Sequence, residues 1–356
     1  MLLNLERFYQ ACNPSRPLMI ENLDDRSYYY IDFASVRGGK IIEALLRTIT
    51  RISPNTPTCQ LFTGHLGCGK STELLRLKAE LEAQDFHVVY FESTHVLEMV
   101  DIDVTDVLLA IAGLVSKSME AIKLRVQPTY FTKLFSEVVD FLQTPIELGV
   151  EAELSVGIGK ITAKTKESPH LRRRLRDYLE PRTENILQSI NTELLDRANL
   201  ELKARGKKGL VVIVDNLDRV AIRPLPSGRS LPEYLFIDRG DQLRKLNCHI
   251  VYTIPLALTF SNDSAQLQYR LGGGLAPKIL PRSALLVLYL LTDENHKRPF
   301  KTHAELKAEL SELEDPSNLD LILSILVNSG LVVIFHNSPK QYQLIHDYLV
   351  HLIRHL

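Results

Sequence analysis

The chain has 356 residues, with 42 Lys and Arg against 43 Asp and Glu, so its formal net charge is −1. That balance argues against a generally basic nucleic-acid binder, although it does not exclude a local basic patch. Hydrophobic residues make up 45% and charged residues 24%, as in a soluble globular protein long enough for two domains. The four cysteines (Cys12, Cys59, Cys68 and Cys248) are widely spaced. This spacing disfavours a disulfide framework or a cysteine zinc site and favours a reducing cytoplasm.

The hydrophobic stretches of the sequence indicate neither a signal peptide nor a membrane span. The first residues, MLLNLERFYQACNP, carry charge early and lack the apolar block of a signal peptide. The longest apolar stretch, residues 284–291, is less than half as long as a membrane span. We therefore expect a cytoplasmic protein without a membrane partner.

In chain order, the first predicted elements are a short strand at residues 28–33 and a helix after residue 39. A strand-like run at residues 59–63 leads into GHLGCGKST, and a helix at residues 71–83 and a strand at residues 87–91 follow. Strand, loop, helix and strand in this order indicate a βαβ unit, and hence a parallel sheet with helices outside it.

A long stretch between residues 102 and 205 is predicted to be an insertion into this sheet. Residues 102–142 and 171–205 have helical patterns, whereas apolar and polar residues alternate between 149 and 166, which predicts a β-hairpin. An isolated hairpin cannot bury its apolar face alone, so we expect it to contact a partner or a neighbouring protomer.

After the insertion, GLVVIVDNLDR at residues 209–219 is an apolar strand that ends in acidic residues, typical of a central parallel strand. A further strand is predicted at residues 248–255. From residue 281 the pattern is helical, followed by an apolar strand, a turn, a second strand and a last helix. This order is typical of a winged helix-turn-helix.

The stretch GHLGCGKS matches the complete phosphate-binding pattern GxxxxGKS. Its glycines let the backbone wrap, so that successive N–H groups point at phosphate oxygens, and the following helix adds its N-terminal partial charge. We expect Lys70 to reach the β- and γ-phosphates and the Ser71 hydroxyl to bind Mg²⁺. The predicted nucleotide-binding residues of this loop are Gly64, His65, Leu66, Gly67, Cys68, Gly69, Lys70, Ser71 and Thr72.

The strand that ends at Asp215 supplies the acidic residue that such a site needs. We expect Asp215 to hold the water shell of Mg²⁺, and Asp218 is the nearest candidate base for orienting the attacking water. Asn216 stands where many strand-catalysis ATPases carry a catalytic Glu, so hydrolysis is expected to be slow or to depend on Asp218. Thr253, at the end of the strand HIVYTIP, is either a sensor of the γ-phosphate or a packing residue. Five candidates for an arginine finger stay open: Arg219, Arg239, Arg244, Arg270 and Arg282.

Together these motifs resemble the STAND class of P-loop ATPases, which is related to the AAA+ group. VVIVDNLDR is similar to the DxLD strand end of the KAP and NACHT families, and the long separation of Lys70 from Asp215 resembles the large insertion of KAP-type ATPases. The resemblance implies an α/β fold: a P-loop NTPase parallel sheet with flanking helices, a helical and β-hairpin insertion, and a C-terminal winged-helix domain. It also implies ATP or ADP and Mg²⁺ as cofactors.

The C-terminal pattern LVNSGLV…YQLIHDYL resembles the winged-helix end of STAND proteins, where a Met-His-Asp triplet opens the last helix. Ile345, His346 and Asp347 take that place here. The resemblance implies that His346 contacts the β-phosphate of bound ADP and locks the resting state; the alternative is a solvent-exposed histidine. The strand at Thr253 lacks the arginine that many STAND proteins place after it, and no repeat array or effector domain follows, so we expect the effector on a separate chain.

The expected division of the chain is an N-terminal segment (1–56), a P-loop ATPase core (57–280) with its insertion at about 102–205, and a winged-helix domain (281–356). Three functions compete. The first is a slowly hydrolysing ATPase switch whose nucleotide state controls assembly with partners or with itself. The second is an AAA+-like, DNA-associated ATPase, a loader or a regulator of transposition or repair, which the winged helix and the basic stretch at 160–182 support.

The would-be recognition helix, LDLILSILVNSG, is nearly all apolar and offers no side chains to base edges, so we expect it to be buried against the ATPase core. Nucleic-acid contact is therefore not favoured. The third function is that of a small-molecule kinase. The sequence lacks the lid arginines that such a kinase needs, and a kinase would have no use for the winged helix. The switch is the function that the sequence favours.

Overall fold

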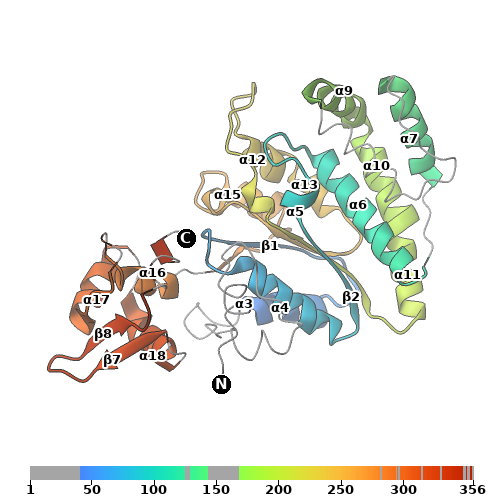
Figure 1. Cartoon of the computed structure of the whole chain (residues 1–356). Coiled ribbons are helices and arrows are strands. Elements are labelled where there is room, and N and C mark those ends of the chain that lie inside the picture. Colours follow the sequence, from blue (N-terminus) through green and yellow to red (C-terminus); the bar gives the residue numbers. More distant parts are fainter. Residues whose placement is uncertain are drawn as a thin grey trace. The chain divides into compact units, whose positions relative to one another are not determined.

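The computed structural model describes residues 41–124, 129–142, 168–280 and most of 283–354 (Figure 1). The described residues belong to two compact units. The sheet unit contains residues 45–63 and 77–278, and the C-terminal unit contains residues 64–76 and 279–354 together with 41–44. The predicted strand at 28–33 and the predicted hairpin at 149–166 lie outside the described residues.

A five-stranded sheet is built in the order β2-β3-β4-β1-β5. Neighbouring strands pair in parallel from β2 to β3, from β3 to β4 and from β4 to β1. Every residue of β1, β3 and β4 is buried, which explains why these strands read as continuous apolar runs and not as alternating ones. The strands are β1 (Cys59–Gly64), β2 (Phe86–Glu92), β3 (Gly209–Asp215), β4 (His249–Thr253) and β5 (Lys278–Leu280).

Parallel pairing brings the carboxyl ends of β1, β2, β3 and β4 to one edge of the sheet. In the register, Glu92 lies opposite Asp215, and Phe62 lies opposite Thr253. Ligands of open α/β sheets bind outside this carboxyl edge. The predicted parallel sheet is therefore confirmed, and its strand order places the ends of the two sequence motifs at the same edge.

The described part of the predicted insertion is helical. Its elements are α6 (Val104–Ala121), α7 (Thr129–Leu142), α9 (Pro169–Leu179), η2 (Glu180–Arg182), α10 (Thr183–Ser189), the π-helical η3 (Ile190–Leu195) and α11 (Asp196–Ala204). α6 packs on β2 and on α10, α11 packs on β3, and α7 packs on α9 on the side away from the strands (Figure 1). A capping box of Asp103 and Asp106 fixes the start of α6.

The remaining helices before residue 278 lie outside the predicted insertion. They are α3 (Ile41–Arg47), η1 (Thr48–Ile52), α4 (Lys70–Glu82), α5 (Ser93–Val96), η4 (Leu217–Arg219), α12 (Leu231–Glu233), η5 (Tyr234–Asp238), α13 (Gly240–Arg244), α14 (Leu256–Thr259) and α15 (Ser264–Arg270). The division into units runs through two of these helices: residues 41–44 of α3 and 70–76 of α4 belong to the C-terminal unit.

The C-terminal unit has its own apolar core and a three-stranded antiparallel sheet in the order β6-β8-β7. Helix, strand, helix, helix and hairpin follow one another, which is the element order of a winged helix-turn-helix. The elements are α16 (Ser283–Leu290), β6 (Lys301–Thr302), α17 (His303–Ser311), η6 (Pro316–Asn318), α18 (Leu319–Asn328), β7 (Val332–Phe335) and β8 (Gln341–Leu344).

The would-be recognition helix is α18. It buries Leu319, Ile322, Leu323 and Leu326 against α16 and β7 of its own unit, so this unit provides the partner for its apolar face. Across all described residues, no helix is both long enough and apolar enough to cross a membrane.

Candidate functional site

The phosphate-binding motif forms the turn between β1 and α4. Gly67 and Gly69 have φ values of 76° and 88°, which L side chains rarely adopt. At Gly64, a Cβ atom would lie 2.8 Å from the carbonyl oxygen of Leu280 and 2.8 Å from Cys68 Sγ. The loop therefore requires glycine at these three positions for two different reasons, backbone conformation and close approach.

Lys70 is the first residue of α4 and is 8% exposed. Its Nζ donates hydrogen bonds of 3.0 Å to the carbonyl oxygens of Gly64 and His65, so the ammonium group lies over the turn. Ser71 and Thr72 follow in the first helical turn and are partly exposed. The structure thus brings a cation, two hydroxyl groups and the amino end of a 13-residue helix to the turn.

Asp215 ends β3 and is completely buried. Its Oδ2 accepts a hydrogen bond of 2.8 Å from the Tyr90 hydroxyl, and its Oδ1 accepts one of 2.7 Å from the main-chain amide of Asn216. The Ser93 hydroxyl donates to its main-chain oxygen at 2.6 Å. These hydrogen bonds orient the Asp215 carboxylate. We call the group at this edge the strand-end cluster; it consists of Tyr90, Glu92, Ser93, Asp215, Asn216 and Thr253.

Asn216 adopts a left-handed conformation, with φ 58° and ψ 13°. Asparagine tolerates this region better than most residues, which gives a local reason for its presence at a position where a glutamate is common. Its Nδ2 donates a hydrogen bond of 3.0 Å to Glu92 Oε2. Glu92 is a polar residue at this edge that the sequence motifs missed. The one signal for it was an acidic residue at the end of the second strand, HVVYFE.

Thr253 Oγ1 accepts a hydrogen bond of 2.8 Å from the amide of Leu217 and donates one of 3.2 Å to the carbonyl oxygen of Val214. The hydroxyl therefore ties β4 to the turn that follows Asp215, which fits the packing interpretation of this threonine. A contact with γ-phosphate stays a prediction. Asp218 lies in the short helix η4 after this turn and is partly exposed.

The arginine candidates differ in their surroundings. Arg270 donates to Asp241 Oδ2 and to the main-chain oxygen of Asp238, and Arg244 also pairs with Asp241. Arg239 lies 3.7 Å from a Glu180 carboxylate oxygen, and Arg219 is exposed. Arg282 lies outside the described residues.

His346 is exposed and follows β8. Next to it, Asp347 forms an ion pair with Arg298, which also donates to the main-chain oxygens of Leu344 and Ile345 at 2.8 Å. Arg298 thus fixes the backbone that carries the His-Asp pair. The predicted contact of His346 with a nucleotide stays a prediction.

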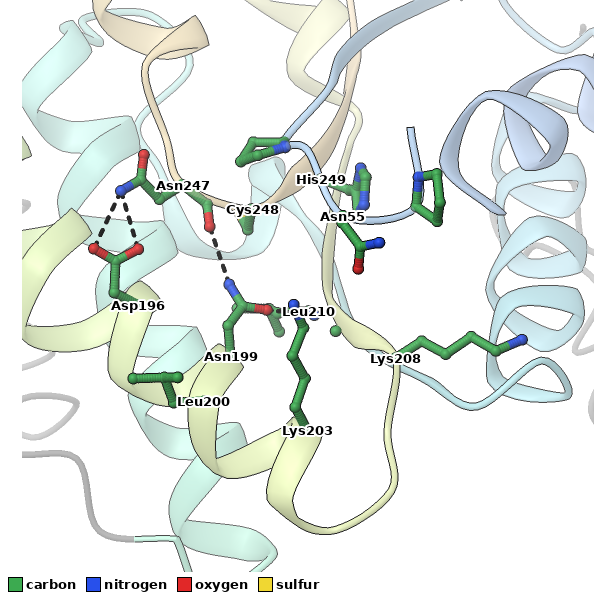
Figure 2. Close-up of a pocket in the computed structure, with 13 residues that line it drawn as sticks. Asn55, Asp196, Asn199, Leu200, Lys203, Lys208, Leu210, Asn247, Cys248 and His249 are labelled. Atoms are coloured by element: carbon green, nitrogen blue, oxygen red, sulfur yellow. Dashed lines mark hydrogen bonds between the residues drawn. The ribbon is translucent and has the colours of Figure 1, made fainter. Parts of the chain in front are cut away.

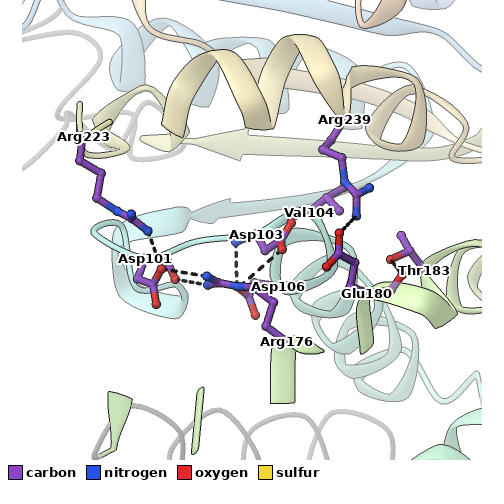
Figure 3. A network of polar contacts seen from close by, with 9 residues as sticks. All are labelled: Asp101, Asp103, Val104, Asp106, Arg176, Glu180, Thr183, Arg223 and Arg239. Atoms are coloured by element: carbon purple, nitrogen blue, oxygen red, sulfur yellow. Dashed lines mark hydrogen bonds and ion pairs between the residues drawn. The ribbon is translucent and has the colours of Figure 1, made fainter. Parts of the chain in front are cut away.

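A second acidic group surrounds Arg176 of α9 (Figure 3). Arg176 donates to Asp101 Oδ1 and to the main-chain oxygen of Asp101, both at 2.9 Å, and its Nε lies 3.4 Å from Asp103. Arg223 donates to the same Asp101 oxygen at 2.6 Å. Burial alone would raise the pKa of Asp101, but Arg176 and Arg223 outweigh it and lower that pKa. Here arginines neutralise the carboxylates, and the group joins α9 to the start of α6.

A cavity of about 480 Å³ lies at the amino ends of β3 and β4 (Figure 2). Asn199 spans part of its wall: its Nδ2 donates to the main-chain oxygen of Asn247 and its Oδ1 accepts from the amide of Leu210. His249 also lines the cavity, and burial is the main cause that lowers its pKa to about 4. Because the cavity is at the amino edge of the sheet, it is not the predicted phosphate site.

Comparison with protein families matches residues 39–227 to the KAP family P-loop domain. No curated protein matches the sequence. Three solved structures are similar over most of the chain. The Orc1 protein of Aeropyrum pernix in complex with DNA is 13% identical, with 96% of each chain covered and a TM-score of 0.31.

Cdc6p from Pyrobaculum aerophilum is 11% identical, with 94% of this chain and 97% of that chain covered and a TM-score of 0.34. The Orc2 protein of Aeropyrum pernix is 10% identical, with 92% and 95% covered and a TM-score of 0.27. These TM-scores are low, so the three likenesses add nothing to the family match.

Proposed function

The chain belongs to the KAP family of P-loop domains, and on that premise we propose that it is a cytoplasmic, ATP-binding and slowly hydrolysing molecular switch. One observation carries the proposal. A complete GxxxxGKS turn follows β1, a buried aspartate ends β3, and both strands end at the carboxyl edge of one parallel sheet.

In this proposal the backbone of residues 64–72 surrounds the β- and γ-phosphates of ATP, and Lys70 offsets their charge. The carbonyl oxygens of Gly64 and His65 hold the Lys70 ammonium in place over the turn, so phosphate oxygens would meet a cation that is already positioned. The helix α4 adds its amino-terminal partial charge.

Ser71 and Asp215 are the proposed ligands of Mg²⁺ and its water shell. A hydroxyl and a carboxylate fit this ion, because Mg²⁺ binds through few protein oxygens and keeps several waters. The hydrogen bonds from the Tyr90 hydroxyl and from the main-chain amide of Asn216 orient the Asp215 carboxylate. Bound Mg²⁺ would neutralise part of the phosphate charge.

Turnover is proposed to be slow because Asn216 stands where many related ATPases carry a catalytic glutamate. Asp218 follows in η4, and we propose that it orients the attacking water. The slow step would let the ATP-bound and ADP-bound states persist, as a switch requires. Thr253 ties the turn after Asp215 to β4, and sensing of the γ-phosphate is the alternative role that is tested below.

His346 is the proposed ADP contact of the resting state, with Arg298 fixing its backbone through the neighbouring Ile345 and Asp347. In the ATP state the chain would assemble with a separate effector or with further copies of itself. A DNA partner is not favoured, because α18 (LDLILSILVN) has no basic side chain for phosphate contacts.

Calorimetry with Mg-ATP tests the proposal. Lys70→Ala removes the charge opposite the β- and γ-phosphates, so affinity should fall at least about tenfold, or about 1.4 kcal/mol. Lys78→Ala is the matched control, since it removes a lysine of the same helix that pairs with Glu82. Equal affinities for the wild type and Lys70→Ala would contradict the nucleotide site.

The switch itself is tested by light scattering after size-exclusion chromatography, with ADP and then with a non-hydrolysable ATP analogue. A change of mass between the two nucleotides is expected, either alone or with a candidate effector. The same run with duplex DNA separates the switch from a DNA-associated ATPase, which would shift with DNA in one nucleotide state.

A further inference from the structure

A general base that accepts the proton of the attacking water speeds hydrolysis of the γ-phosphate, and residue 216 is an amide, which cannot be that base. The structure supplies a carboxylate one strand away. Glu92 is the last residue of β2, it lies opposite Asp215 in the register, and its Oε2 accepts a hydrogen bond from Asn216. We propose that Glu92 is the base of the ATPase reaction and that Asn216 is its positioning residue; the inference rests on the proposed function.

Strand pairing makes the placement of Glu92 specific. Because β2 and β3 are parallel, Glu92 and Asp215 end at the same edge, where the two carboxylates divide the work. In this proposal Asp215, held by Tyr90 and by the main-chain amide of Asn216, serves the cation, and Glu92 serves the reacting water. The Glu92 side chain is 24% exposed, so solvent can exchange protons with it after each turnover.

The hydrogen bond from Asn216 explains how this carboxylate stays in place. The Asn216 Nδ2 lies 3.0 Å from Glu92 Oε2, and the left-handed backbone of Asn216 directs its side chain toward β2. The amide is a neutral donor that fixes the rotamer of the Glu92 side chain. An imidazole nitrogen of exposed His95 lies 4.0 Å from the same oxygen.

In the step itself, the water oxygen forms a bond to the γ-phosphorus while the bond from that phosphorus to the β–γ bridging oxygen breaks. ADP leaves with the electron pair of the broken bond, inorganic phosphate is released, and the Glu92 carboxylate takes one proton from the water. That proton passes to solvent. Asp218 then orients the water and does not accept its proton.

The experiment measures single-turnover hydrolysis of Mg-ATP together with its Kd. Glu92→Gln should lower the hydrolysis rate by roughly 10²- to 10⁴-fold, the usual contribution of a general base, with a Kd close to that of the wild type. Asp218→Asn should slow hydrolysis less. Glu201→Gln, at an exposed position of α11, is the matched control and should change neither quantity.

Asn216→Gly isolates the positioning residue, because glycine keeps the left-handed backbone and removes only the amide. We expect hydrolysis to fall about tenfold with Kd unchanged, since a loosened base loses alignment. If Glu92→Gln does not fold, Glu92→Asp is the second variant, because it keeps the carboxylate but places it one methylene farther away. It too should lower the hydrolysis rate and leave the Kd for ATP unchanged.

Two outcomes overturn the inference and leave ATP binding intact. In the first, Glu92→Gln hydrolyses ATP as fast as the wild type, whatever the rate of Asp218→Asn. In the second, the wild-type chain binds ATP but does not hydrolyse it. Failure of the wild type to bind ATP would overturn the proposed function as well. Binding and turnover therefore report on the two proposals separately.

Discussion

The two edges of the five-stranded sheet both bury polar side chains but use them differently. At the amino edge, the amides of Asn199 and Asn247 bond to backbone groups or to Asp196, and a cavity of about 480 Å³ lies beside them. At the carboxyl edge, two carboxylates accept hydrogen bonds from side chains on, or directly after, the neighbouring strand: Asp215 from Tyr90, and Glu92 from Asn216.

Under the proposed function, the reaction takes place at the carboxyl edge and not beside this cavity. Amides that complete the hydrogen bonds of strand starts stabilise the sheet, because a buried backbone group without a partner is costly. At the carboxyl edge, the hydrogen bonds from Tyr90 to Asp215 and from Asn216 to Glu92 fix the orientation of two carboxylates, as the proposed reaction requires. The three expectations below test this division, beginning with the largest effect.

Asp215→Ala at the carboxyl edge should abolish hydrolysis, because Asp215 acts through Mg²⁺, while some metal-free nucleotide binding persists. The measurement is ATP turnover together with nucleotide affinity, each with Mg²⁺ and with EDTA. Asp196→Ala at the amino edge is the control: it loses a hydrogen bond to Asn247 and should hydrolyse ATP like the wild type. Turnover that survives Asp215→Ala would remove the distinction between the edges.

His249 at the amino edge should make stability depend on pH. Its native pKa of about 4 is below the unfolded value of 6.5, so the unfolded chain binds the proton first as the pH falls. The contribution is fully present above pH 6.5 and is lost toward pH 4, at about 1.4 kcal/mol per pH unit and roughly 3 kcal/mol in all.

Urea unfolding of the wild type and of His249→Gln across this pH range measures the effect. The glutamine variant should show a flatter dependence, and its affinity for ATP at neutral pH should be unchanged. Parallel curves for the two proteins would show that another group is responsible.

Thr253→Val sharpens the comparison within the carboxyl edge. The valine keeps the volume but leaves the buried amide of Leu217 without its acceptor, which should cost about 1–3 kcal/mol of unfolding free energy. If Thr253 ties the turn, the Thr253→Val variant should have a lower free energy of unfolding even without nucleotide. A variant of wild-type stability with slower turnover would instead point to γ-phosphate sensing.

Much of this edge is predictable from local patterns. A short stretch of sequence predicts the turn at Gly64–Lys70, and another predicts the strand that ends at Asp215. The strand order, in which β4 lies between β1 and β3, could not be predicted from these stretches. The apolar pattern of α18 correctly predicts a buried helix, but not that α16 and β7 would bury it. A pattern shows that a face is apolar and does not show what covers it.

The contact between Glu92 and Asn216 could not be predicted in this way. The two residues are 124 positions apart, with the helical insertion between them, and only the pairing of β2 with β3 brings them together. The left-handed backbone of Asn216 is equally invisible in sequence, since asparagine occurs in many conformations. The same holds for Arg176, whose partners at Asp101 and Asp103 belong to another helix start.

The left-handed turn at Asn216 also restricts how this pair can change over evolutionary time. A glutamate at 216 would cost about 1–2 kcal/mol of backbone strain and would set a second anion beside Glu92. Replacing Glu92 by asparagine first would leave two amides and no anion at the two positions. Either single replacement therefore passes through a strained or an inactive ancestor, and descendants of this chain should keep or exchange the two residues together.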